Sequence, residues 1–184
     1  NNVVKTYYLI IFTFMATLTV KEGKHDFKPS IFPWPRLGEL HFEFVLTESC
    51  WYDSLGSDNY DFNKAVGLFK YLDFDKNNNA FMLAWRPDLT KQFYFECVPY
   101  ENRDKAILAN EDKILICKAG DVIKGYFKPD KEGWELYIVL EDSVILWHKS
   151  KLITCLYGVV DSWFGGNNVA MKEMNVKLSI NNPR

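Results

Sequence analysis

Apolar and polar side chains alternate along much of this chain with a period of two. Between residues 7 and 20, every even position from Tyr8 to Val20 is apolar, and threonine occupies three of the odd positions. A period of two places successive side chains on opposite faces of a β-strand. The run could be taken for the apolar part of a signal peptide, but it is too short to span a bilayer as a helix. We therefore predict a strand.

The same alternation returns in several later segments: 39–46, 81–86, 92–97, 134–140 and 174–180. Further strand candidates are 113–118, 122–128, 144–148 and 152–159. The stretch Phe62–Tyr71 fits a strand or a short helix about equally well. Clusters of Gly, Pro, Asn and Asp between these segments indicate turns. Many short strands at hairpin-like spacing, with no linker and no long repeat, predict one all-β domain over residues 1–184, a two-sheet antiparallel jelly-roll β-sandwich.

Composition narrows the classes of protein that this chain can belong to. The chain is 48% hydrophobic and 25% charged, with a net charge of −2. It can therefore build a core, and it is not a generally basic nucleic-acid binder. Aromatic residues make up 16% of the chain. Strand parity places many of them in the core: Phe12, Phe14, Phe42, Phe44, Phe81, Trp85, Phe93, Phe95 and Trp134. Those left for the surface are Trp34, Trp51, Tyr94, Tyr137 and Trp163.

Metal and cofactor signatures are not found in the sequence. The four cysteines are widely spaced with no Cys-x-x-Cys, and the three histidines are far apart, so we predict no zinc site. Cys97 is in register with Phe93 and Phe95, which predicts a buried free thiol. The oxygen-rich stretch 73–79 has no glycine or distal glutamate in EF-hand register, so a hairpin turn is favoured over a calcium loop. No nucleotide-binding glycine motif is present, and we expect no cofactor.

One constellation could carry chemistry. Glu39, His41 and Glu43 would project from one face of a strand, about 6–7 Å between neighbours. Two carboxylates at that spacing could act as acid and base or nucleophile in glycoside hydrolysis, with His41 between them. The alternative is a solvated strand face whose charges discourage edge pairing. A second polar set (Arg86, Tyr94 and Glu96) would share the face if its strands belong to the same sheet.

Carbohydrate recognition needs aromatic faces for sugar C–H groups, and amides, carboxylates or arginine for sugar hydroxyls. The chain has both kinds of group. The candidate ligand-binding residues are Arg86, Tyr94, Glu96, Asn63 and Trp163.

The segment Ser162-Trp163-Phe164-Gly165-Gly166-Asn167-Asn168 resembles the closing motif of a largely uncharacterised β-sandwich family of bacteria and their phages. In that family a (Y/W)FGGN turn precedes the last strand. Other pieces agree in order: Lys21–His25, Glu48–Tyr52, Asn63-Lys64, Asn78–Ala80 and Ala84–Arg86. The resemblance implies a concanavalin A-like jelly roll, the fold of legume-type lectins, laminarinase-like glucanases and several polysaccharide lyases.

The motif departs from the family pattern at Met171, Lys172 and Glu173, where the family has Pro-His-Asp. Any chemistry of that His and Asp is therefore lost here. The glucanase ExDxxE and lyase YFKAG signatures are also absent. We interpret Gly165 and Gly166 as a tight turn that uses positive φ angles and holds Trp163 in place.

The first hypothesis for function is a non-catalytic, lectin-like carbohydrate-binding module. One alternative is a structural or assembly protein of a virion, appendage or surface, with protein partners or self-assembly. The other is a glycoside hydrolase or polysaccharide lyase that uses Glu39, His41 and Glu43, helped by Arg86 and Tyr94. The partner would be a glycan or a protein, without nucleic acid and without a membrane span. An extracellular, cell-surface or virion location fits these hypotheses.

Overall fold

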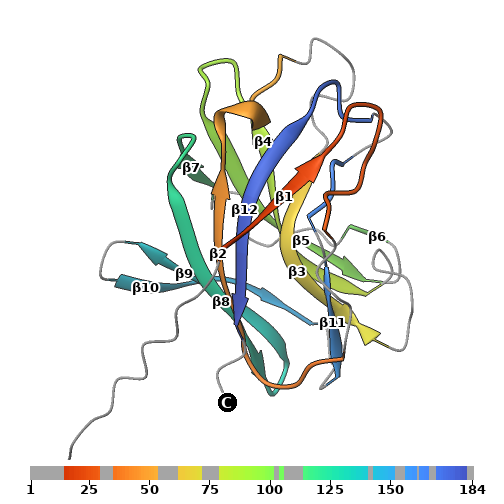
Figure 1. Cartoon of the computed structure of the whole chain (residues 1–184). Helices are drawn as coiled ribbons and strands as arrows, with labels where there is room; N and C mark the ends of the chain where they lie inside the picture. Colours follow the sequence, from red (N-terminus) through yellow and green to blue (C-terminus); the bar gives the residue numbers. More distant parts are fainter. Residues whose placement is uncertain are drawn as a thin grey trace, which may run out of the picture.

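Two antiparallel β-sheets face each other in the computed structural model of the chain (Figure 1). The structure describes residues 15–29, 35–53, 62–71, 79–101, 104–105, 114–140, 143–151, 156–160, 162–165 and 169–181. Within these ranges the regular elements are strands and one short 3-10 helix, η1 (Glu48–Cys50). The prediction of an all-β, two-sheet sandwich is thus confirmed.

The first sheet has six strands, and β2 and β8 lie at its centre. Its order is β1 (Ala16–Val20), β12 (Met174–Asn181), β2 (Leu40–Leu46), β8 (Val122–Asp130), β9 (Gly133–Leu140) and β10 (Ser143–Ser150). In Figure 1, β1, β12, β2 and β8 lie side by side.

The second sheet contains the stretch for which a strand and a helix were equally plausible, and that stretch forms β3. The order of this sheet is β11 (Tyr157–Val160), β3 (Asn63–Lys70), β4 (Ala80–Pro87), β5 (Phe93–Glu101) and β6 (Asp104–Lys105), while β7 (Leu115–Cys117) also pairs with β5. Val66 and Leu68 of β3 belong to the core between the sheets, whereas Phe69 packs against a separate cluster with Met82, as expected for neighbouring residues on opposite faces of a strand.

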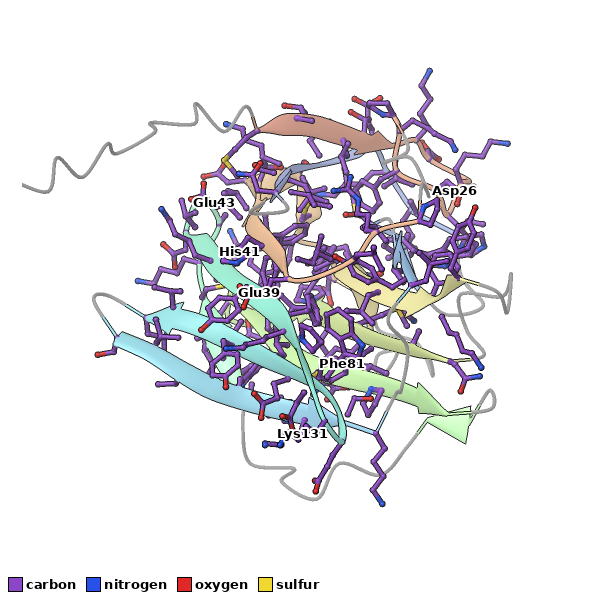
Figure 2. All side chains as sticks on the ribbon, turned by 90° about the horizontal axis from the view of Figure 1, so that it is seen from below. Asp26, Glu39, His41, Glu43, Phe81 and Lys131 are labelled. Carbon is purple, nitrogen blue, oxygen red and sulfur yellow. The ribbon has the colours of Figure 1, made fainter. Side chains whose placement is uncertain are left out.

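The core lies between the sheets and is filled by aromatic side chains, as parity predicts. Seven of the nine predicted core aromatics are buried; Phe12 and Phe14 lie outside the described residues. Phe81, seen in the interior in Figure 2, meets Phe127 edge to face, with ring centroids 5.5 Å apart. Edge-to-face contacts of this kind stabilise a core beyond the burial of apolar area. The aromatic content of the chain therefore mainly explains how the sandwich is filled.

The outer face of the second sheet carries a small apolar cluster of its own, which includes Met82 and the partly buried Phe69. Two glycines make room for it. A Cβ at Gly67 would lie 2.7 Å from Met82 Cγ, and one at Gly158 would lie 2.4 Å from the Phe69 ring. The described side chains of this part of the face are therefore packed against one another.

The cysteines are free thiols in the interior. Cys97 is buried, as predicted, and so are Cys50 and Cys117; Cys155 lies outside the described residues. Burial raises the pKa of Cys50 to about 11 and that of Cys117 to about 12. These thiols belong to the core, where they act as small apolar side chains.

One edge of the sandwich is closed by residues 21–29, which we call the crossing segment. Thr19 of β1 and Lys28 exchange backbone hydrogen bonds of 2.8 and 2.7 Å at the edge of the first sheet. Asp26 forms a β-bridge with Trp163, and Trp163 forms another with Lys64 of β3 in the second sheet. The crossing segment thus joins the edges of both sheets.

Candidate functional site

Glu39, His41 and Glu43 lie on one outer face of the first sheet, along β2 and the residue before it. Figure 2 shows the three in a row, far from Asp26. Neighbouring core residues of the same strand point to the interior. The arrangement on one face follows directly from strand parity.

The charges of this face neutralise one another. His41 Nε2 lies 2.9 Å from Glu39 Oε2, and Lys124 Nζ lies 2.9 Å from Glu43 Oε1. Lys128 Nζ lies 3.9 Å from the other oxygen of Glu39. The side chains of both glutamates are about one third exposed (34% and 33%), so water screens the pairs. Each carboxylate already has a cationic neighbour on an open surface.

Aromatic rings on the same face cover one another. His41, Tyr126 and Tyr137 are cross-strand neighbours on β2, β8 and β9. The ring centroids are 4.9 Å apart for His41 and Tyr126 and 4.8 Å apart for Tyr126 and Tyr137, with interplanar angles of 16° and 13°. The rings therefore stack face to face, and the faces between them are not open to a sugar.

At the Tyr137 end of this row of rings, a hydrogen bond and an ion pair hold the side chains in place. The Tyr137 hydroxyl donates a 2.7 Å hydrogen bond to Glu135 Oε2, and Lys149 pairs with the other oxygen of Glu135. The hydrogen bond to Glu135 raises the pKa of Tyr137 to about 12. Hydrogen bonds from Lys149 and Tyr137 hold the pKa of Glu135 below its usual value. Beside the row the surface forms a hollow of only about 240 Å³.

Arg86, Tyr94 and Glu96 do not share this face, because the condition for sharing it, strands of one sheet, is not met. They lie on β4 and β5 of the second sheet, whereas β2 belongs to the first. Parity tells which side of its own sheet a residue faces, but not which sheet its strand joins. Arg86 and Tyr94 are therefore not placed beside Glu39, His41 and Glu43.

The second-sheet set has local partners. The Arg86 guanidinium carbon lies 4.9 Å from the ring centroid of Phe62 and 5.8 Å from that of Tyr94. A hydrogen bond to the Asp88 carboxylate raises the pKa of Tyr94. Arg86 is thus held between two rings by cation–π contacts.

Asn63 is a positioning residue, because it is buried and both ends of its amide are used inside the protein. Its Nδ2 donates to the Tyr52 hydroxyl at 2.9 Å, and its Oδ1 accepts from the Gly165 backbone N–H at 2.8 Å. The side chain is therefore not placed to contact a ligand. It fixes the segment that follows Trp163.

Trp163 is half-buried and stacks on His25, with centroids 5.4 Å apart and an interplanar angle of 18°. His25 Nδ1 lies 3.0 Å from the Phe164 carbonyl oxygen. Because a carbonyl only accepts, Nδ1 carries the proton of this hydrogen bond. The pair lines a cleft of about 930 Å³ between β1, the crossing segment and Trp163. We call this the edge cleft.

Besides Lys28, four charged side chains line the edge cleft: Lys21, Lys24, Asp26 and Glu173. Within the described part of the chain, none of these four has an ion-pair partner. The face of the first sheet differs in this respect, because its glutamates are paired. The edge cleft combines an aromatic wall with donors and acceptors that a ligand can use without first breaking an ion pair.

Segments that are far apart in the sequence meet beside the edge cleft: Lys24-His25, Tyr52, Phe164 and Ala170. Phe164 N donates to the His25 carbonyl at 2.8 Å, and Ala170 N donates to the Lys24 carbonyl at 2.9 Å. The ring of Tyr52 lies 5.4 Å from that of Phe164. The sequence analysis names Trp163 as a candidate ligand-binding residue, but it does not predict that Lys21–His25 lie beside it.

Gly165 corrects part of the turn interpretation. Its φ angle is not in the positive region. Instead, a Cβ at this position would lie 2.2 Å from the Phe62 carbonyl oxygen. The glycine is required by close approach to β3. Gly166, Asn167 and Asn168 lie outside the described residues, as does Trp34.

The described ranges have neither a metal-binding cluster nor a membrane-spanning helix. They contain no group of three His, Cys, Asp or Glu side chains that could hold a metal ion. Nor does any helix in these ranges have the length and apolar character needed to cross a bilayer. Most of the Asp73–Asn79 stretch lies outside them.

Comparison with known proteins adds no function. No protein-family model matches the sequence, and no curated protein matches it. Among solved structures, a crystal structure described as that of a functionally unknown protein from Saccharomyces cerevisiae matches with a TM-score of 0.45 and 8% sequence identity, over 89% of this chain and 83% of that chain.

Proposed function

We propose that the protein is a non-catalytic, lectin-like carbohydrate-binding module on a concanavalin A-like jelly roll, and that the edge cleft is its sugar site. One observation carries the proposal: the stacked Trp163 and His25 rings share a cleft of about 930 Å³ with charged groups that have no ion-pair partner in the described chain. The volume is that of a small-ligand site.

The chemistry of sugars fits this combination. The C–H face of a sugar ring packs on an aromatic ring, and its hydroxyls donate to carboxylates and accept from ammonium groups. Asp26 and Glu173 supply the acceptors, and Lys21 and Lys24 supply the donors. Hydrogen bonds to charged groups contribute more than neutral ones, roughly 1.5–3 kcal/mol each.

The face of the first sheet is the weaker candidate. A ligand that binds the carboxylates there would have to separate Glu43 from Lys124. Catalysis is not part of the proposal, because Glu39 and Glu43 each face a lysine on an open surface.

The test is titration of the protein with a panel of neutral oligosaccharides, followed by calorimetry and by tryptophan fluorescence. Asp26→Asn keeps the shape of the side chain and removes its charge, and we expect it to weaken binding at least tenfold. Glu43→Gln on the first sheet is the matched control and should bind as the wild type does.

Two results would overturn the proposal. One is the absence of saturable binding across the panel. The other is a loss of affinity in Glu43→Gln as large as that in Asp26→Asn. Light scattering on the same samples tests the alternative hypothesis, because a large assembly that is indifferent to sugar would favour a structural protein.

A further inference from the structure

A second hollow lies at the same end of the sandwich as the edge cleft. It has a volume of about 500 Å³, and Trp51, Lys91 and Lys118 are among its lining residues. Trp51 follows η1 directly, and its indole Nε1 donates a 2.9 Å hydrogen bond to the Asp88 carbonyl. We call this the Trp51 hollow. Its aromatic wall is fixed by a hydrogen bond as well as by packing against the core.

The backbone holds Lys91 in an unusual conformation beside this wall. Its φ angle is 62°, in the left-handed region that residues other than glycine seldom adopt. The Asp88 carboxylate builds the turn: its Oδ1 accepts from the backbone N–H groups of Thr90 and Gln92, at 2.9 and 2.7 Å. This turn places Lys91 Nζ 5.6 Å from the centroid of the Trp51 ring. Strain retained in a loop is a reason to ask what the residue does.

Among the residues that line the Trp51 hollow, lysines outnumber carboxylates. Lys91 and Lys118 line it, against one carboxylate, that of Glu48. In the described part of the chain neither ammonium group has an ion-pair partner. The Asp88 carboxylate accepts hydrogen bonds within its own turn, including one of 2.6 Å from Thr90 Oγ1 to its Oδ2. The hollow therefore suits an anionic group.

The Trp51 hollow and the edge cleft are joined through the interior. Trp51 is followed by Tyr52, whose hydroxyl accepts from Asn63, and Asn63 in turn holds Gly165 next to Trp163 and Phe164. Across the second sheet, β5 pairs with β4, β4 with β3, and β3 with Trp163. The three strand spacings from β5 to Trp163 add up to about 15 Å across the sheet. In Figure 1, η1, the loop after β1 and the turn before β8 all lie in the upper half of the view, with the loop at the right and the turn at the left.

We propose that the edge cleft and the Trp51 hollow are two subsites for one oligosaccharide, and that the Trp51 hollow takes a sugar that carries a carboxylate or sulfate group. This inference rests on the proposed function and names its ligand class: an acidic glycan of several residues. A charged group between Lys91 and Lys118 would add affinity that depends on salt.

The experiment compares three oligosaccharides of equal length: neutral, uronate-bearing and sulfated. They are titrated against the wild type and against the double variant Lys91→Gln/Lys118→Gln, at low and at moderate salt. We expect the double variant to bind the acidic ligand at least tenfold more weakly, to lose most of the salt dependence, and to bind the neutral ligand unchanged. The uronate and sulfate arms identify which acidic group is preferred.

The double variant Lys124→Gln/Lys128→Gln is the matched control. It removes two lysines from the face of the first sheet, and it should bind all three ligands as the wild type does. Both variants change exposed side chains, and thermal unfolding verifies that they are folded.

The outcomes separate this inference from the proposed function. If all three ligands bind equally well and the Lys91/Lys118 variant changes nothing, the second subsite is refuted and the edge cleft stands. If the control variant loses as much affinity as the Lys91/Lys118 variant, general charge attraction replaces the subsite. If no ligand binds, the proposed function fails, and the subsite fails with it.

Discussion

The Asn63 side chain accepts a 2.8 Å hydrogen bond from the backbone N–H of Gly165, a residue 102 positions further along the chain. The same amide donates to Tyr52, so one buried side chain links three segments at the end of the sandwich. The edge cleft lies on one side of this link, and the Trp51 hollow lies on the other. The hydrogen bonds of Asn63 therefore position the edge cleft and the Trp51 hollow, although the Asn63 side chain itself contacts no ligand.

Replacement of Asn63 by alanine should be strongly destabilising. The substitution leaves the Gly165 N–H and the Tyr52 hydroxyl without their partner in a buried place, so we expect the free energy of unfolding to fall by about 2–3 kcal/mol. Denaturant unfolding followed by fluorescence measures it. Tyr52→Phe removes only one of the two bonds and should cost less. A loss in Asn63→Ala no larger than that in Tyr52→Phe would contradict the linking role.

Two glycine substitutions should have different costs for different reasons. In Gly165→Ala the new Cβ would lie 2.2 Å from the Phe62 carbonyl oxygen, and the chain would have to move, at a cost of about 1–3 kcal/mol. In Gly38→Ala nothing lies within 4 Å of the Cβ, but φ is 76°, so the cost is a backbone term of about 1 kcal/mol. Sugar titration separates them further: only Gly165→Ala should weaken binding at the edge cleft. Equal sugar affinities in the two variants would argue against coupling of Gly165 to the cleft.

The buried thiols should be unreactive until the protein unfolds. A Cys155→Ser background leaves Cys50, Cys97 and Cys117, all buried. We expect a thiol reagent at neutral pH to label none of the three in the native protein and all of them in denaturant. Fast labelling of the native protein would show that one of these thiols is open to solvent.

The raised pKa of a buried thiol also predicts how the stability of the protein changes with pH. Burial raises the folded-state pKa of Cys50 from the ordinary 9.0 to about 11, so the folded state holds this proton more tightly than the unfolded chain does. Its contribution to stability is complete below pH 9 and is lost as the pH rises through about 11. Denaturant unfolding of the wild type and of Cys50→Ala across this range should show a smaller alkaline loss in the variant.

Strand parity was enough to predict the sandwich and most of its core. Side chains such as Phe44 and Phe95 are buried because a period of two leaves them no other face, and this information is local. The outward face shared by Glu39, His41 and Glu43 is local in the same sense.

Sheet membership could not be predicted in this way. Whether Arg86 joins the face of Glu39 depends on which strands pair, and those pairings involve residues far apart in sequence. The stacking of His25 on Trp163 likewise depends on a bridge between two irregular segments. No periodicity covers such segments, so their contact could not be predicted from the sequence pattern. The partial covering of the rings on β2, β8 and β9 was equally hidden, because it depends on cross-strand register.

The crossing segment has a consequence for the behaviour of the protein at high concentration. An exposed edge strand offers unpaired N–H and C=O groups to strands of other molecules, and this is a route to aggregation. Both outward backbone groups of Thr19 in β1 are hydrogen-bonded to Lys28 of the same chain. The crossing segment, which lines the edge cleft, therefore also shields the Thr19 end of β1 from intermolecular pairing. A ligand that holds this segment in place would protect that end of the strand from aggregation.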